Sequence, residues 1–291
     1  MAYTPTVTDQ LNNSLPTIRA SARLVREQKG DMVGLVERRT LGRGMGDTWH
    51  EISYDKLTAQ AISETTVNTN IQQISDNDFP IKPTMIQIAT MLTDKVGRNI
   101  SQNGLREIGR LAQNAMQRKR NIDGLTTIDA TTSTQLGSAG ASMTFGLVAA
   151  GVANIEGNSS EPGEPPIRFV AHPFCIKDIY SQFTAPVGTY DISNGATFDV
   201  FQNGFRGMIN TAQVFVNGDF TIDSQYDVKN GVFAQEGIVH VQEMSPNIET
   251  KREALIGGGS TIVVHTDSYA YGIRQNNWVQ EIIADATAPT S

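Results

Sequence analysis

PTMIQIATMLTDKVGRNISQNGLREIGRLAQNAMQRKR, residues 83–120, is the stretch that decides the fold. Its apolar residues recur at three- and four-residue spacing, which predicts one face of a helix. The stripe comprises Met85, Ile88, Ala89, Leu92, Val96 and Ile100, followed by Leu105, Ile108, Leu111, Ala112, Ala115 and Met116. Pro83 suits a first helical turn, and Asn121 and Gly124 are typical of a helix end. We therefore predict helix from Pro83 to about Arg120.

The length of this stretch bears on the shape of the molecule. About 38 helical residues would span roughly 57 Å, whereas a compact chain of this size has a diameter of about 50 Å. An unbroken helix would therefore be longer than a spherical body. Two interpretations remain open. Gly97, Gly104 or Gly109 divides the stretch into two ordinary core helices, or one spine helix runs under an elongated, plate-like molecule.

Composition restricts the class of protein. The chain has 291 residues, of which 39% are hydrophobic and 18% charged, enough for a folded domain with a sizeable core. No apolar run reaches the 18 or more residues of a membrane span, so no membrane partner is expected. The N-terminal residues lack the pattern of a secretory signal. Cys175 is the single cysteine and has no intrachain disulfide partner. These features favour synthesis inside a cell.

The chain is acidic, with a formal net charge of −7 and a pI near 5.1. A dedicated nucleic-acid binder gains most of its affinity by neutralising phosphates with basic residues. The charge therefore argues against such a binder. It remains compatible with a protein that encloses nucleic acid without gripping it.

Residues 42–79 predict a second unusual feature, a long twisted hairpin. Residues 49–56 alternate in character, and so do Val67, Thr69, Ile71 and Gln73, which is the two-residue period of a strand. We place the turn at or just after Asp55-Lys56. Ahead of the hairpin, residues 1–14 read as an extended arm, 16–29 as a short amphipathic helix and 32–40 as a strand.

A hairpin of this length raises a physical problem. Two isolated strands are marginal in water, and their open edges invite further pairing. Arms of 12 to 15 residues would reach roughly 40–50 Å, beyond the radius of the body. The hairpin is either a flap folded back on its own chain or a loop that lies across a neighbouring copy.

The second half of the chain alternates short strands and helices, typical of a mixed α/β domain. Thr144 can cap a helix from Phe145 to Ile155, and residues 157–166 (GNSSEPGEPP) mark a boundary. Further helices are expected at 173–183 and 198–203. Strands are expected at 167–171, 213–217, 237–242, 261–266, 269–274 and 278–283.

The residues that most often carry chemistry form no recognisable pattern. None of the four histidines lies in a zinc-binding motif, and no nucleophile elbow occurs. The glycine runs at 42–46 and 257–259 lack the lysine of a phosphate loop. The aspartates at 76, 78, 219, 223 and 227 lack the ligand ladder of a calcium loop. We predict no catalytic residue, no cofactor and no metal; an enzyme that uses Cys175 or His172 stays as an alternative.

Taken in order, these segments resemble the major capsid protein of tailed bacteriophages, the Hong Kong 97-like fold that encapsulin shells also use. The resemblance rests on the order of elements over nearly the whole chain. It runs from the arm and basic helix through the hairpin (GDTWHEISYDKLTAQ to NDFPI) and the helix ending MQRKR to FGLVAAGVANI, RFVAHPFCIKDIYSQF, GFRGMINTAQVFVNG and GGGSTIVVHTDSYAYGIRQNN.

The resemblance implies an α+β fold with five parts. They are an N-terminal arm with a short helix (1–41), an extended E-loop hairpin (42–79), a P-domain with the spine helix (80–156), an A-domain (157–234) and returning strands shared by the P- and A-domains (235–291). It also implies a structural protein, not an enzyme, that self-assembles as hexamers and pentamers into an icosahedral head shell around double-stranded DNA.

The implied partners are further copies of the chain, with scaffolding, portal or decoration proteins as additional ones, and the implied location is the virion after synthesis in the bacterial cytoplasm. An encapsulin-type nanocompartment and a tail or ring protein are the structural alternatives. We expect Trp49, Ile52, Tyr54 and Leu57 of the hairpin to contact an adjacent subunit.

Overall fold

The computed structural model describes residues 32–65, 67, 69, 71–99, 102–184, 207–256 and 258–289, with the backbone alone at 102–108. Residues 83–120 contain one strand and two helices. Strand β4 (Thr84–Thr93) is followed by the short helix α2 (Asp94–Asn99) and the long helix α3 (Gln102–Asp129). The prediction of one helix from Pro83 was therefore wrong in its first ten residues. The predicted arm and helix before residue 32, and the helix at 198–203, lie outside the described residues.

Residues 84–93 form a strand because their apolar pattern also fits a two-residue period. Ile86 and Ile88 alternate with the more exposed Met85, Gln87 and Ala89. Threonine and isoleucine, which are β-branched, supply half of the segment, and such residues favour strands. The strand pairs along its full length with β11 (Ser260–Ile273), and this long-range pairing overrides the helical spacing.

Helix α3 continues nine residues beyond Arg120, so the predicted end at Asn121 and Gly124 was also wrong. The Asn121 side chain, 2% exposed, hydrogen-bonds Asn217 and Asp219 and accepts a bond from the Met32 backbone N–H. Both residues therefore serve close packing inside the helix. The 28 residues of α3 are roughly 42 Å long.

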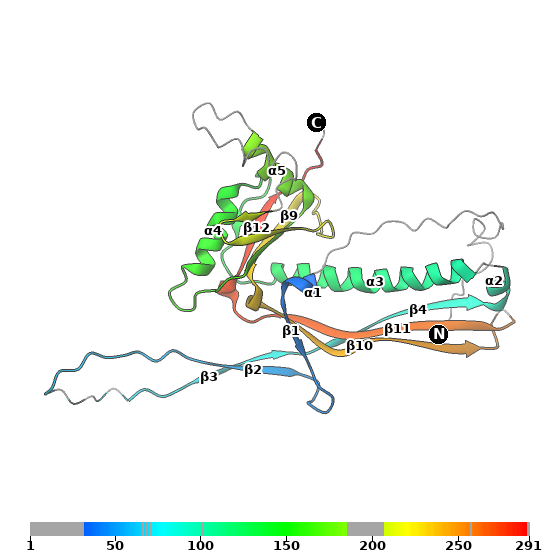
Figure 1. Cartoon of the computed structure of the whole chain (residues 1–291), viewed down its shortest axis with the longest axis horizontal. Helices are drawn as coiled ribbons and strands as arrows, with labels where there is room; N and C mark the ends of the chain where they lie inside the picture. Colours follow the sequence, from blue (N-terminus) through cyan, green and yellow to red (C-terminus); the bar gives the residue numbers. More distant parts are fainter. Residues whose placement is uncertain are drawn as a thin grey trace.

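Beneath α3 lies a four-stranded sheet in the order β1-β10-β11-β4 (Figure 1). It contains β1 (Glu37–Thr40), β10 (Ile238–Glu253), β11 and β4. Strands β10 and β11 are longer than predicted, because the expected strands at 261–266 and 269–274 are one continuous element. Residues 32–40, predicted as strand, begin with the single helical turn α1 (Met32–Leu35) before β1.

A six-stranded mixed sheet in the order β5-β12-β9-β6-β8-β7 forms the second body of the molecule. Its strands are β5 (Leu136–Gly137), β12 (Val279–Asp285), β9 (Asp227–Ala234), β6 (Ile167–Ala171), β8 (Ala212–Val216) and β7 (Met208–Ile209). Helices α4 (Phe145–Glu156) and α5 (Pro173–Thr184) pack on it, and Thr144 caps α4 as predicted. The main hydrophobic core lies here, around Phe169, Phe233 and Ile282. The two 3₁₀ turns, Gln235–Gly237 and Asn276–Trp278, join its strands to the long sheet.

The third sheet is the predicted hairpin. Strands β2 (Trp49–Tyr54) and β3 (Asp76–Ile81) pair antiparallel, Trp49 opposite Ile81 and Tyr54 opposite Asp76. The turn was predicted at or just after Asp55-Lys56; the Asp55 N–H still bonds the Ser75 carbonyl, so no turn forms at Asp55-Lys56 and the connection between the strands is the long segment 55–75. In Figure 1 this hairpin projects far from both other sheets. None of the helices in the described ranges combines the length and apolar character that a membrane crossing needs.

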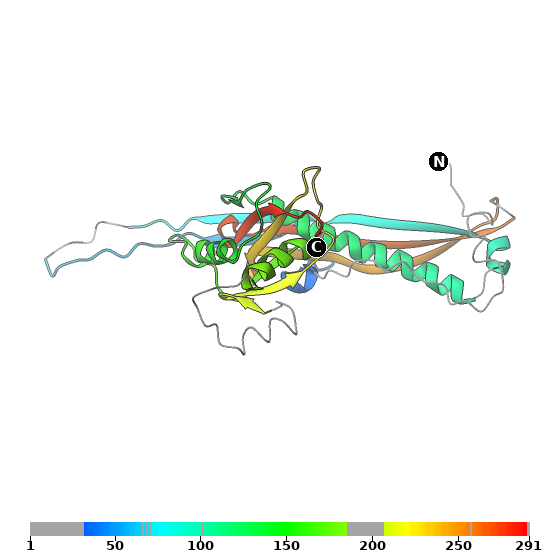
Figure 2. The ribbon, with the colours of Figure 1, turned by 90° about the horizontal axis from the view of Figure 1, so that it is seen from above.

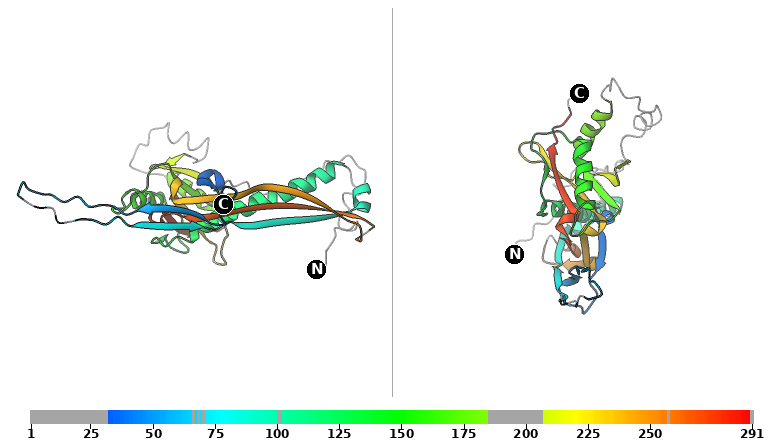
Figure 3. Two further views of the ribbon diagram at one scale, coloured as in Figure 1. Left: turned by 90° about the horizontal axis from the view of Figure 1, so that it is seen from below. Right: turned by 90° about the vertical axis from the view of Figure 1, so that its left-hand side faces the viewer.

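The molecule is long and narrow. Figure 2 shows α3 running alongside the long strands, with the hairpin extending from one end of the body and the β10–β11 turn at the other. Viewed along its length in Figure 3, the molecule presents a small cross-section. The elongated, plate-like interpretation of the sequence is the one that this shape supports.

Candidate assembly surfaces

The root of the hairpin is fixed to its own chain by apolar contacts. Trp49 and Phe79 pack against a buried cluster made of Leu41, Ile81, Val239 and Val241. Strand β11 passes directly below, where a Cβ on Gly272 would stand 2.8 Å from Ile81 and 2.9 Å from Phe79. Glycine is therefore required at this crossing. Trp49, chosen from the sequence as a subunit contact, is half-buried within its own chain.

The other predicted contact residues are exposed. Ile52 is 56% exposed, Tyr54 72% and Leu57 62%. Ile52 and Tyr54 are more exposed than Trp49 because successive residues of a strand point to opposite faces, and these two lie on the face opposite to that of Trp49. Trp49 and Glu51 face the body, whereas Ile52 and Tyr54 face away from it. The structure thus divides the predicted set between an anchoring face and an outward face.

The distal part of the hairpin, residues 57–75, is nearly uncharged and carries exposed apolar side chains among polar ones. Glu64 is its single charged residue. Val67 is 81% exposed, Ile71 93% and Ile74 65%. The Thr58 N–H donates to the Gln72 side chain at 2.7 Å, and that amide in turn donates to the Thr58 carbonyl. Exposed apolar side chains on a projecting segment mark an interaction site.

The two long edges of the four-stranded sheet, formed by β10 beyond its short partner β1 and by β4, differ in chemistry. Strand β10 is covered by β1 only at residues 239–242, and its remaining length carries Pro246, Glu249, Lys251 and Arg252, the residue types that protect an edge from pairing. Strand β4 has no charged residue among its ten, and no described strand covers its outer edge. A long, uncharged, open edge is a template for strand addition. Sequence reasoning missed this edge because it assigned 84–93 to a helix.

A buried ionic network joins α3 to the sheet. Arg120 pairs with Asp267, which is fully buried, and its guanidinium lies 5.5 Å from the Tyr269 ring centre. The Tyr269 hydroxyl donates to Asp123 at 2.9 Å. Burial and this bond to Asp123 raise the pKa of Tyr269. These contacts hold α3 against β11.

Cys175 and His172, the residues of the enzyme alternative, are built into the core. Cys175 is fully buried, and its thiol lies 3.5 Å from both the Asp285 carbonyl and the Asn230 side chain. Burial raises the pKa of this thiol to about 11, so it carries little thiolate near neutral pH. Burial also lowers the pKa of His172, whose Nδ1 accepts the Phe174 N–H.

Most of the remaining sequence candidates occupy turns, whereas Asp76 and Asp78 lie in strand β3. Gly44 and Gly46 have φ values of 86° and 91°, and Gly258 and Gly259 of 74° and 114°, conformations that favour glycine. Asp223 and Asp227 accept backbone N–H bonds within their turn and from Gly140. Within the described ranges, no group of three or more histidine, cysteine or acidic side chains is arranged to hold a metal ion.

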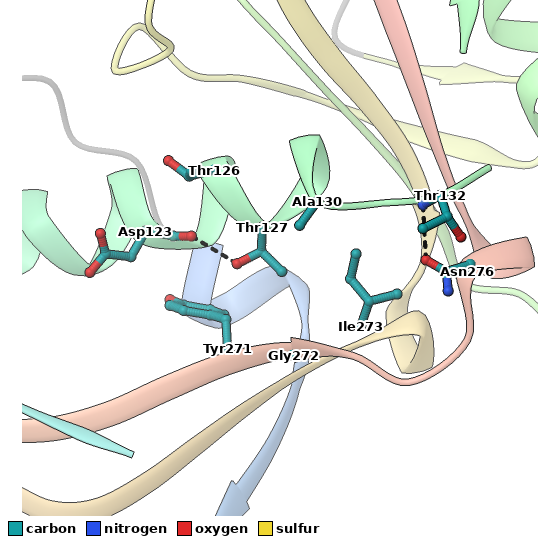
Figure 4. Close-up of a pocket in the computed structure, with 9 residues that line it drawn as sticks. All are labelled: Asp123, Thr126, Thr127, Ala130, Thr132, Tyr271, Gly272, Ile273 and Asn276. Atoms are coloured by element: carbon teal, nitrogen blue, oxygen red, sulfur yellow. Dashed lines mark hydrogen bonds between the residues drawn. The ribbon is translucent and has the colours of Figure 1, made fainter. Parts of the chain in front are cut away.

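One hollow of about 520 Å³ lies where the end of α3 meets β11 (Figure 4). Its walls are Asp123, the threonines of α3, Tyr271, Ile273 and Asn276. The dashed lines mark the Thr127 hydroxyl donating to the Asp123 carbonyl at 2.8 Å and the Thr132 N–H donating to Asn276 at 3.1 Å. The Asp123 carboxylate is already held by Tyr269 and Lys119. These groups serve the packing of the helix end and do not converge on the space.

No family model and no curated protein sequence matches the chain. Solved structures do. The structure is similar to that of Mycobacterium phage Che8, with a TM-score of 0.70 at 13% identity, covering 93% of this chain and 97% of the other. It is also similar to the capsid of Helicobacter pylori bacteriophage KHP30, with a TM-score of 0.70 at 10% identity over 98% of this chain and 100% of that one.

A third similar structure is the holo-SrpI encapsulin complex from Synechococcus elongatus, with a TM-score of 0.62 at 10% identity, covering 93% and 95% of the two chains. Likeness at such low identity concerns the fold. This chain therefore has the Hong Kong 97-like α+β fold over nearly its whole length, and the fold expected from the order of its sequence segments is confirmed.

Proposed function

We propose that this chain is the major capsid protein of a tailed phage. It self-assembles as hexamers and pentamers into an icosahedral head shell that encloses double-stranded DNA, after synthesis in the host bacterium. The observation that carries the proposal is the hairpin, which projects beyond the body with Ile52, Tyr54 and Leu57 exposed. The known shells with this fold support it.

The energetics of the hairpin support a second copy as its partner. An isolated two-stranded ribbon is marginal in water, and this one exposes apolar side chains along most of its length. An apolar burial of about 1,000 Å² per neighbour would contribute roughly 25 kcal/mol before association and ordering costs. Repetition around a closed shell turns modest contacts into a stable particle.

We place the hairpin of one copy along the open β4 edge of the next. The distal hairpin has one charge in residues 57–75, and β4 has none. Both segments are rich in threonine and β-branched residues, and both leave backbone groups without a described strand partner. Strand addition would satisfy those groups on both sides. The charged β10 edge is the poorer acceptor.

The parts of the subunit follow from this assignment. The arm and first helix (1–41), the E-loop (42–79), the P-domain (80–156), the A-domain (157–234) and the returning strands (235–291) would serve contacts between copies. The net charge of −7 suits a wall that confines DNA without binding it tightly. Scaffolding, portal and decoration proteins are the further partners of such a shell.

An encapsulin-type nanocompartment is the second candidate, favoured by the likeness to the SrpI encapsulin complex. It needs the same contacts between copies but holds protein cargo in place of DNA. Particle content separates the two: purified native particles that contain nuclease-protected double-stranded DNA support the capsid, and particles with co-purifying enzyme and no DNA support the compartment.

Electron microscopy of the purified chain tests the proposal. Closed shells of uniform diameter are expected. A chain that remains monomeric under all assembly conditions, or that forms open tubes, contradicts it.

A matched pair of variants tests the place of the hairpin. Ala89→Lys puts a charge on the exposed β4 edge strand, and Thr250→Lys puts the same charge on the exposed half of β10. Ala89→Lys is expected to reduce shell yield at least tenfold, while Thr250→Lys assembles normally. Equal yields from both variants would contradict docking on β4 without contradicting shell formation.

A further inference from the structure

Arg274, the residue after β11, contacts both the body and the hairpin. On the body, its Nη1 donates to the Glu37 carboxylate of β1 and, at 2.9 Å, to the Glu236 carbonyl. On the hairpin, Nη2 donates to Glu51 Oε2 at 2.9 Å, and Nε lies 2.9 Å from Glu51 Oε1. The Arg274 side chain is 15% exposed. One guanidinium therefore joins two elements that have no other described ion pair between them.

The Arg274 backbone is itself fixed, because its N–H donates to the Gly237 carbonyl at 2.9 Å. Burial lowers the pKa of Arg274, but the ion pairs with Glu37 and Glu51 outweigh burial and leave the pKa above its ordinary value. The group is thus a permanent cation whose two carboxylate partners come from different sheets. A planar guanidinium holds a carboxylate in a defined direction, which a lysine ammonium does not.

Because the Glu51–Arg274 contact lies near the root, it influences the direction of the whole hairpin. Trp49 and Glu51 lie on the same face of β2, Trp49 in the apolar cluster and Glu51 two residues further towards the tip. The apolar cluster holds the root of both strands through Trp49 and Phe79, and the Glu51–Arg274 pair adds a charged attachment on β2. Two points roughly 7 Å apart define the direction of a strand. Further out, the exposed Lys56 ammonium donates to the Ser159 carbonyl at 3.4 Å.

Glu64, at the far end, lies 15 residues beyond Trp49, up to roughly 50 Å at strand spacing. A displacement of about 1 Å at Glu51 would therefore move the tip by about 7 Å. Without the Glu51–Arg274 pair, the apolar root and the exposed Lys56 bond are left to hold the hairpin, and we expect its direction to vary more.

We propose that Arg274 is a positioning residue that sets the direction of the hairpin relative to the body, and with it the angle at which successive copies join. This inference rests on the proposed shell function. In an unassembled copy, the hairpin already points in the direction that assembly requires. Joining two copies therefore does not have to order the hairpin. Loss of the Glu51 contact leaves a folded subunit whose hairpin direction varies, and shells of mixed diameter follow.

Two glutamate variants isolate this role. Glu51→Ala removes the charged attachment of the hairpin but leaves Arg274 paired with Glu37. Glu37→Ala removes an ion pair from the same arginine but leaves the hairpin attached. Asp47→Asn, which breaks the exposed pair with Lys82 beside the hairpin root, is a third variant of little expected effect.

Hairpin direction is measured as a distance distribution between spin labels at Gln60→Cys on the hairpin and Asn154→Cys on α4, both exposed positions. Buried Cys175 does not compete for the label. The distribution is expected to be at least twice as broad in Glu51→Ala as in the parent and unchanged in Glu37→Ala and Asp47→Asn. Micrographs of Glu51→Ala are expected to show mixed shell diameters.

The proposal is overturned if Glu51→Ala keeps the parental distance distribution, or if Glu37→Ala broadens it equally, since the effect would then be general loss of stability. Thermal unfolding of each variant checks that the body stays folded. If the parent chain forms no shells at all, the proposed function fails, whereas the label distances in the unassembled subunit still decide the role of Arg274.

Discussion

Gly124 of α3 and Met32 of α1 lie so close together that a Cβ on the glycine would stand 2.8 Å from the Met32 Cβ. The Tyr271 ring of β11 is 3.1 Å from the same position. Three elements that are distant in the sequence therefore meet at one residue. Glycine, which is usually unfavourable inside a helix, is required here by the close approach of its neighbours.

The first prediction follows from this contact. Gly124→Ala is expected to lower the free energy of unfolding by about 1–3 kcal/mol, because the added methyl group overpacks the junction. At Gly109, in the same helix, a new Cβ would have no described neighbour within 4 Å apart from the backbone of α3 itself. Gly109→Ala is therefore expected to raise stability by up to about 1 kcal/mol. Denaturant titration measures both. Stabilisation by both substitutions would show that the junction can relax.

Gly124 also illustrates the limits of local sequence reasoning. A glycine after an apolar helical stripe is a good stop signal, and the residues around it supported that interpretation. The helix continues through Gly124 because α1 and β11 pack closely against it there. Neither of these neighbours can be identified from the sequence of the helix itself. The same limit applies at 84–93, where apolar residues fit both periods and pairing with β11, almost 180 residues away, selects the strand.

The hairpin was predictable because its signal is local. Alternation and polar composition at 42–79 indicated two paired strands, and the length argument left open whether they fold back on the chain or extend from it. The division of the contact residues followed only with the register, which places Trp49 opposite Ile81. Arg274 carried no signal, since it is separated from Glu51 by 223 positions.

The second prediction separates anchoring from contact along the hairpin. Trp49→Ala is expected to lower the free energy of unfolding by about 2 kcal/mol, because it removes part of the apolar cluster at the root. Ile52→Ala and Tyr54→Ala are expected to change stability by less than about 0.5 kcal/mol and to reduce shell yield several-fold. Thermal unfolding and particle counts measure the two effects. Normal assembly of the double variant Ile52→Ala/Tyr54→Ala would remove this face from the contact.

The third prediction concerns Cys175. Its thiol is fully buried and its pKa is raised by that burial to about 11, and the thiolate is the reactive form. Native protein at pH 8 is therefore expected to react with a thiol reagent at least 100-fold more slowly than unfolded protein, which should react with one equivalent. Asn154→Cys, on an exposed turn of α4, serves as the control and should react at once. Rapid native labelling of Cys175 would point to opening of the core.

The last prediction concerns acid stability and rests on His240. This histidine is 1% exposed and lies between the rings of Tyr269 and Tyr271, with centroid distances of 5.7 and 4.8 Å. Burial is the main cause that lowers its pKa to about 4; the charges of Arg120 and Arg38 act in the same direction, and that of Asp267 opposes them. The folded state therefore holds a neutral imidazole at pH values where the unfolded chain, with a pKa near 6.5, binds a proton.

Because the unfolded state binds the proton first, stability is complete above about pH 6.5 and falls as the pH drops towards 4, below which this contribution stays constant. The loss from His240 alone amounts to up to about 3 kcal/mol. His240→Phe keeps an aromatic ring between the tyrosines and cannot be protonated, so it is expected to flatten the fall in unfolding free energy between pH 6.5 and 4. The exposed His50→Phe should leave that slope in place. An unchanged slope in His240→Phe would mean that the buried imidazole is not the group that limits stability in acid.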